Sequence, residues 1–223
     1  MRNLSTIMVV LVMLAMCATS FGNYFLIYNV SASVKGADDN TGLAATIPLK
    51  GYLVLNLSGP VTVEDANLVL YGNDSNTPKK QKAYIELSYT EMADGHFVEM
   101  THIGDFIFLE IAEYADPGPF YFDVYVMGKW KEKDISGTLT PVASSMKGAL
   151  VVWSGYLLGP SPDQDISGTS NISLTLNNTY TKYVNGTDPT WTQDQILNGQ
   201  MIDGALRGIK PDLEKKGFIN GAF

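Results

Sequence analysis

Cysteine and histidine are almost missing from this chain of 223 residues. It holds one cysteine, Cys17, and two histidines, His96 and His102. Small secreted domains often rely on disulfides, and one cysteine cannot form a disulfide within the chain. On a strand, the two histidines would be about 20 Å apart at ~3.3 Å per residue. We therefore expect neither a disulfide framework nor a zinc site shared by these histidines.

Recognisable catalytic and cofactor motifs are also lacking. The sequence has no Gly-x-Ser-x-Gly turn and no phosphate-binding loop. Four carboxylates would suit a glycosidase pair, whose separation decides the mechanism. They are Glu86, Glu99, Glu110 and Glu113. We assign no catalytic residue and no cofactor, and we expect a non-enzymatic protein rather than an enzyme.

The chain has fewer basic than acidic residues. The chain has 15 Lys and Arg against 23 Asp and Glu, a net charge of −8. Nucleic-acid affinity depends on neutralising phosphates with Lys and Arg, and anionic lipid surfaces likewise attract basic segments. We expect no nucleic-acid partner. An unknown protein, a glycan or a small apolar ligand remains as the expected partner.

Long hydrophobic runs are absent after the first 22 residues, so we expect no transmembrane helix in the mature chain. The start of the chain is different. Residues 1–3 are short and basic, residues 7–16 form an unbroken apolar run, and small residues come next. This layout is typical of a secretory signal peptide. A cut after Ser20 or after Gly22 fits, and we expect a signal peptide 1–22 and a secreted or periplasmic protein.

A second interpretation of the signal concerns Cys17. Leu14-Ala15-Met16-Cys17 loosely resembles a bacterial lipobox, in which the cysteine becomes the lipidated N-terminus, although Met16 departs from the usual Gly or Ala. Two acyl chains or more would anchor the protein stably. Lipoprotein anchoring through Cys17 is therefore the alternative to a cleaved signal.

Most later apolar stretches are short, rich in β-branched or aromatic residues, and bounded by Gly, Pro, Asn or Asp, which is typical of strands. The predicted strands are 24–35, 45–57, 67–71, 83–90, 96–101, 106–112, 120–130, 136–142, 147–158 and 171–177. Their short connections favour antiparallel pairing, because parallel strands need long crossovers. We expect an all-β protein, an antiparallel sandwich or barrel of about ten strands.

Segments 52–57 and 106–109 are apolar on both faces. A sheet with one face in water would alternate more cleanly. Either both faces are covered, as in the centre of a sandwich, or one face lines a dry interior. The second possibility suits a barrel that carries an apolar ligand.

The last part of the chain has a different pattern. Apolar residues recur at roughly helical spacing from Thr192 to Arg207, at Ile196, Met201, Ile202 and Leu206. Gly199 and Gly204 weaken this helix, and Pro211 would end it. We expect a β domain over 23–191, and a short helix that caps the open end of the sheets, followed by a mobile tail, over 192–223.

Part of the β domain resembles another part. Lys50-Gly51 and Lys147-Gly148 each open an apolar segment that is followed by Leu-x-Gly-Pro and then by an Asn that begins a further strand. We interpret this as an internal pseudo-duplication, with two similar halves at about 23–119 and 120–191. The two segments should superpose, each with its lysine at the start of a long strand and with Leu53 and Leu150 facing the same side.

Two groups of oxygen ligands would suit calcium, at 38–40 and at 163–165 with Gly168. Neither has the spacing of an EF-hand loop, so the metal residues stay unknown. The first functional hypothesis is an exported non-enzymatic β protein that binds or scaffolds at the cell envelope or outside the cell. The alternatives are a soluble carrier of an apolar ligand and an extracellular polysaccharide-acting hydrolase.

Overall fold

The computed structural model describes most of the predicted β domain and a few residues C-terminal to it. The described residues are 23–38, 44–73, 82–90, 96–114, 121–135, 137–156, 165–186 and 192–197. The predicted signal segment, 1–22, and the predicted tail lie outside these ranges.

Ten strands and two short helices make up the described part of the chain. The strands are β1 (Tyr24–Asp38), β2 (Ala44–Leu57), β3 (Val63–Asn73), β4 (Lys82–Thr90), β5 (His96–Ile103), β6 (Phe106–Tyr114), β7 (Tyr121–Ile135), β8 (Thr138–Ala143), β9 (Ser145–Tyr156) and β10 (Asp165–Leu176). The helices are α2 (Asn178–Val184) and α3 (Gln193–Leu197). The predicted all-β class and the ten strands are confirmed, with β7 and β10 longer than expected.

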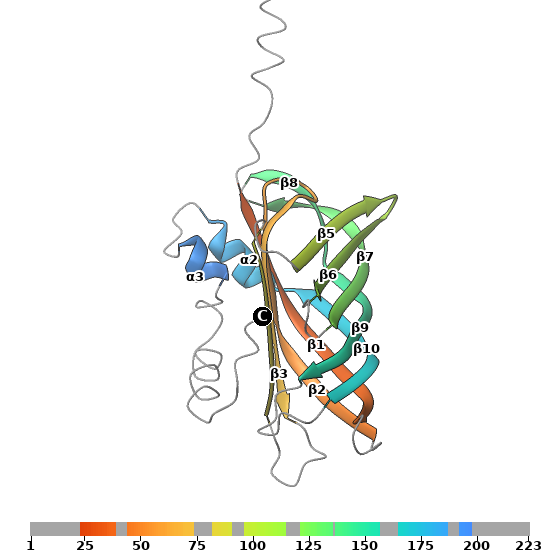
Figure 1. Cartoon of the computed structure of the whole chain (residues 1–223). Coiled ribbons are helices and arrows are strands. Elements are labelled where there is room, and N and C mark those ends of the chain that lie inside the picture. Colours follow the sequence, from red (N-terminus) through yellow and green to blue (C-terminus); the bar gives the residue numbers. More distant parts are fainter. Residues whose placement is uncertain are drawn as a thin grey trace, which may run out of the picture.

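The strands form one antiparallel sheet in the order β4-β3-β2-β1-β10-β9-β7-β6-β5, and β8 pairs with β7 alone. The sheet curls into a nearly closed barrel (Figure 1). The first and last strands pair near the middle of the sheet, where Ser31 lies opposite Ser173. Of the two predicted architectures, the barrel is the one adopted.

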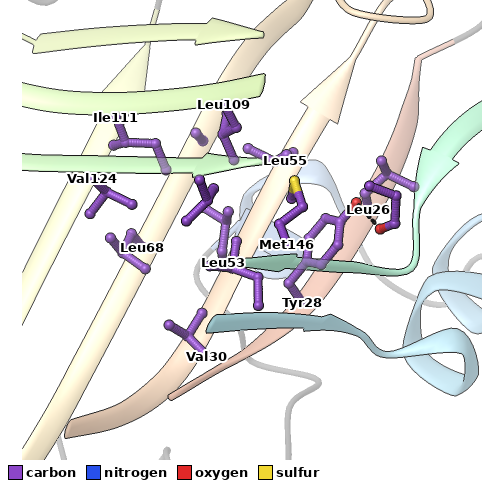
Figure 2. Packing of buried hydrophobic residues seen from close by; sticks show 14 of the residues in the cluster. Leu26, Tyr28, Val30, Leu53, Leu55, Leu68, Leu109, Ile111, Val124 and Met146 are labelled. Atoms are coloured by element: carbon purple, nitrogen blue, oxygen red, sulfur yellow. Dashed lines mark hydrogen bonds between the residues drawn. The ribbon is translucent and has the colours of Figure 1, made fainter. Parts of the chain in front are cut away.

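Apolar side chains point into the barrel interior. Because successive side chains of a strand point to opposite faces, the even positions of β1 and the odd positions of β2 point inward. Figure 2 shows Leu26, Leu53, Leu109 and Val124 among the side chains that converge there. These buried side chains form the apolar core of the described residues.

Tyr24 and Tyr28 each place a phenol group inside this core. The Tyr24 hydroxyl donates to the Gly59 carbonyl oxygen at 2.9 Å, and the Tyr28 hydroxyl donates to that of Ala143 at 3.1 Å. Burial raises the pKa of both tyrosines far above the usual value. Because Ala143 belongs to β8, the second bond ties the β7–β8 hairpin to the core.

A second apolar cluster covers the outer face of β1, β2 and β3. Phe25, Ile27 and Val54 lie in it, together with Val184 of α2 and Ile196 of α3. This cluster explains why segment 52–57 is apolar on both faces, since one face lines the core and the helices cover the other. The predicted helix therefore packs on the outer face of the sheet and does not cap its open end.

Helix α2, which the sequence pattern did not predict, continues the hydrogen bonding of β1 where β10 ends. The Ile27 amide donates to the Thr181 hydroxyl at 3.0 Å, and the Phe25 amide donates to the Asn185 side-chain oxygen at 2.7 Å. The Asn185 side-chain nitrogen donates to the Phe25 carbonyl at 2.7 Å. Side chains of α2 and its C-terminal cap thus satisfy backbone groups of β1.

Helix α3 lies in the described beginning of the predicted helix, and residues 198–207 lie outside the described ranges. It begins with a capping box, because the Thr192 amide donates to the Gln195 side chain and the Gln195 amide donates to the Thr192 hydroxyl. The Asn67 side chain donates to the Leu197 carbonyl at 3.0 Å. These bonds hold α3 against β3.

The two Lys-Gly segments lie in β2 and β9. Leu53 and Leu150 are both buried in the same interior cluster, as predicted. Lys50, however, lies within β2 and not at its start, because β2 begins at Ala44. Since β2 is antiparallel to β1, β1 to β10 and β10 to β9, β2 and β9 run in opposite directions. A twofold rotation about an axis between β1 and β10 therefore superposes β9 on β2 with their inner faces matched. The same rotation superposes β10 on β1 and β7 on β3.

The glycines of these two segments support that pseudo-twofold relation. A Cβ added at Gly51 would lie 1.7 Å from the carbonyl oxygen of Val69 in β3, and one added at Gly148 would lie 1.7 Å from that of Tyr125 in β7. Both strand pairs thus approach too closely for any other residue. In the structure β3 corresponds to β7. The sequence match instead pairs β3 with β10, because Asn67 of β3 matches Asn171 of β10.

Candidate functional site

Exposed apolar side chains gather on one part of the barrel, the outer face of β5, β6, β7 and β9, which we call the binding face. Segment 106–109 shows how it arises. Ile107 and Leu109 point into the core, whereas Phe108 points outward and is 38% exposed. The other large exposed apolar side chains of this face are Phe97, Ile103, Tyr125 and Met127. No helix among the described residues covers them.

The strand register brings these residues together. Thr101 on β5 pairs with Phe108 on β6, Phe108 with Met127 on β7, and Met127 with Lys147 on β9. The side chains surround a hollow of about 530 Å³. This volume lies within the range of small-molecule and side-chain pockets.

Two glutamates that the sequence offered as acid candidates meet in this hollow. Glu99 and Glu110 are register partners on β5 and β6, and both line it. Directly opposed residues of an antiparallel pair have Cβ atoms about 4.5–5.5 Å apart. Tyr125 is the register partner of Glu110 on the other side. The Glu99 carboxylate accepts a hydrogen bond from Thr101 at 3.1 Å.

The environment of Glu110 disfavours a negative charge on its carboxyl group. Burial raises the pKa of the Glu110 carboxyl above its usual value, and the charge of Asp123 raises it as well. A hydrogen bond with the Tyr125 side chain lowers it, and the charge of Glu99 raises it. Asp123 is fully buried on the neighbouring strand β7. Among the described residues, no ion pair neutralises Glu99 or Glu110.

His102 is the other sequence candidate whose side chain the structure describes. Of the remaining candidates, residues 39–40 and 163–164 lie outside the described ranges, and the side chains of Glu86, Glu113, Asp38 and Asp165 are not described. His96 and His102 lie at opposite ends of β5, as expected. The His102 ring packs edge-on against Trp130 and bonds to the Gly104 carbonyl. In the described ranges, no group of three His, Cys, Asp or Glu residues is placed to hold a metal ion.

A second hollow, of about 700 Å³, lies between the β7–β8 hairpin and α2. Polar residues line much of it, and the Lys133 ammonium donates to the Asn178 side chain at 2.7 Å. It lacks the gathered exposed aromatic residues of the binding face.

Sequence reasoning missed the aromatic part of the binding face. Phe108 and Tyr125 are separated by 17 positions and meet only through the β6–β7 register. The signal was present in the doubly apolar segment 106–109, whose outward side chains no described helix covers.

A scan against protein-family models found no match, and a search of curated proteins found no similar sequence. Within the described residues, no helix has the length and apolar character needed to cross a membrane.

Proposed function

We propose that this chain is an exported, non-enzymatic binding protein that acts at the cell envelope or outside the cell, and that it recognises its partner through the binding face. The observation that carries this proposal is the gathering of Ile103, Phe108, Tyr125 and Met127 around one hollow, with Phe97 exposed on the same face. Contiguous exposed apolar patches on a soluble surface mark interaction sites. Aromatic residues and Met are the side chains enriched at such interfaces.

Export is supported by the layout of residues 1–22. Fractionation of the native host, followed by determination of the N-terminal residue, tests it. We expect an extracytoplasmic protein that begins at or near Asn23, or a lipidated one that begins at Cys17. A cytosolic protein with an intact N-terminus would overturn this part of the proposal.

Binding is tested in the same cells with a photo-crosslinking amino acid. We expect a crosslinked species when it replaces Phe108 or Tyr125. Asn29 is the matched control, because it is exposed on β1 outside the binding face. Equal crosslinking at all three positions, or none at Phe108 and Tyr125, would argue against recognition through this face.

The carrier alternative remains a proposal, which rests on the apolar side chains that line the interior of the barrel. The hydrolase alternative keeps one favourable observation, the cross-strand pair of Glu99 and Glu110 in an open hollow. A raised pKa on one acid of a pair is what a general acid requires. If the protein cleaves polysaccharides, Glu110→Gln should abolish the release of reducing ends while the fold is retained.

A further inference from the structure

We propose that the binding face accepts a polypeptide segment that carries a Lys or Arg side chain between apolar side chains, and that Glu99 and Glu110 together hold its cationic group. This inference rests on the proposed function and names the chemistry of the partner.

Charge complementarity is the first argument. Two carboxylates stand opposite each other on adjacent strands, and like charges in that position are destabilising. Lys147 also lines the hollow, but it lies on β9, and β7 separates it from the strands of the glutamate pair. A cation placed between Glu99 and Glu110 would relieve their repulsion. Hydrogen bonds to ionised groups are stronger than neutral ones.

The two glutamates are surrounded by apolar side chains. A cation that also carries an apolar part therefore fits this hollow best. Phe108, Tyr125 and Met127 border the same hollow and are each 38–50% exposed. A metal ion or a small hydrated amine would leave these side chains in water. Lys and Arg carry a charged group on an apolar stem, and their cations interact favourably with aromatic faces. The hollow offers contacts to both parts.

The mixture of side chains favours a peptide over the other classes of ligand. Glycans stack on flat aromatic rings, whereas Ile103 and Met127 present apolar surface that is not aromatic. An anionic lipid surface would be repelled by Glu99 and Glu110. Apolar residues on either side of the basic residue would contact the outer parts of the binding face, at Phe97 and Ile103.

The test uses the full mature chain and three synthetic peptides of nine residues with alternating Val and Thr. Their central residue is Lys, norleucine or Glu. Binding is measured by fluorescence polarisation, and the contacted residues are located by NMR. We expect the Lys peptide to bind at least fivefold more tightly than the norleucine peptide, with perturbations on β5, β6 and β7. The Glu peptide should bind most weakly.

Two matched variants separate the contribution of the pair from that of net charge. Glu99→Gln with Glu110→Gln should weaken binding of the Lys peptide at least fivefold and leave the norleucine peptide unchanged. Asp105→Asn with Glu132→Gln removes the same charge from exposed positions outside the hollow and should leave both affinities unchanged. The glutamine variant relieves repulsion, so it should fold at least as well as the wild type.

Several outcomes would overturn the inference. One is equal affinity for the Lys and norleucine peptides, and another is no binding of the Lys peptide at millimolar concentration. Binding of a neutral oligosaccharide at the same face, or self-association abolished by Tyr125→Ser, would assign the face to a different occupant. In each case crosslinking at Phe108 and Tyr125 reports separately on recognition through the binding face, which fails if that crosslinking is absent or equals the crosslinking at Asn29.

Discussion

At the scale of single residues, the pair of Glu99 and Glu110 carries a cost in stability. The pKa of Glu110 is raised in the folded state, so its ionised form is less favourable there than in the unfolded chain. The charged or polar groups that face it are Glu99 on β5, Asp123 and Tyr125 on β7, and Lys147 across the hollow.

We predict that Glu110→Gln increases the free energy of unfolding at pH 7 by about 0.2–1 kcal/mol, the magnitude of a cross-strand side-chain interaction, because it removes a charge that burial and the neighbouring carboxylates disfavour. The sign comes from linkage, because a raised carboxyl pKa in the folded state makes the wild type lose stability as pH rises from about 4.5 through the folded pKa. The difference in the free energy of unfolding between Glu110→Gln and the wild type should therefore decrease as the pH is lowered. Urea unfolding at pH 4, 5 and 7 measures it, and a gap that widens at low pH would contradict the prediction.

A different residue-scale prediction concerns the close strand approaches. Gly148→Ala should destabilise the protein by about 2 kcal/mol or more, because overpacking forces strands apart and the new Cβ would lie 1.7 Å from a carbonyl oxygen. Gly51→Ala should have a similar effect. Ser31→Ala, on an exposed mid-strand position, serves as the control and should change stability little. If the three variants had equal urea midpoints of unfolding, the strand pairs would accommodate the added Cβ without a loss in the free energy of unfolding.

At the scale of elements, α2 acts as a substitute for a strand. Asn185→Ala would leave the Phe25 amide and carbonyl without the partners that the structure gives them, and a buried group left unpaired costs about 1–3 kcal/mol. We predict faster hydrogen exchange at Phe25, while the Val30 amide stays protected. Asn178→Ala, an exposed position on the same helix, should leave both amides unaffected. Unchanged exchange at Phe25 in Asn185→Ala would show that α2 does not hold the strand.

The strands were predictable from sequence, whereas the elements that pack over each face of a strand were not. Alternation and turn residues reveal a strand such as β6 directly, because both are local properties. The outward exposure of Phe108 depends on which elements lie over β6, and that is decided by tertiary packing. Helix α2 escaped prediction because seven residues show barely two turns of periodicity. Glu99 and Glu110 were candidates by residue type, but only the β5–β6 register brings them together.

At the scale of the whole molecule, the sheet is continuous across the predicted boundary between halves near residue 120. β6 and β7 lie on either side of that boundary and pair along the full length of β6. We predict that 23–119 and 120–223, produced separately, show no dispersed NMR spectrum, and that the intact chain unfolds in one transition. A folded fragment would support two independent units.

The pairing of β1 with β10 has a consequence for when the protein can fold. Ser31 and Ser173 are 142 positions apart and lie side by side, so the sheet cannot be completed until nearly the whole β domain has been synthesised. Contacts this distant in sequence slow folding. β1 has β2 as one partner, but its other partner, β10, is the last strand to be made. A chain that is threaded through a membrane before it folds would gain from that delay, since no stable barrel can form while its first strands are still being transported.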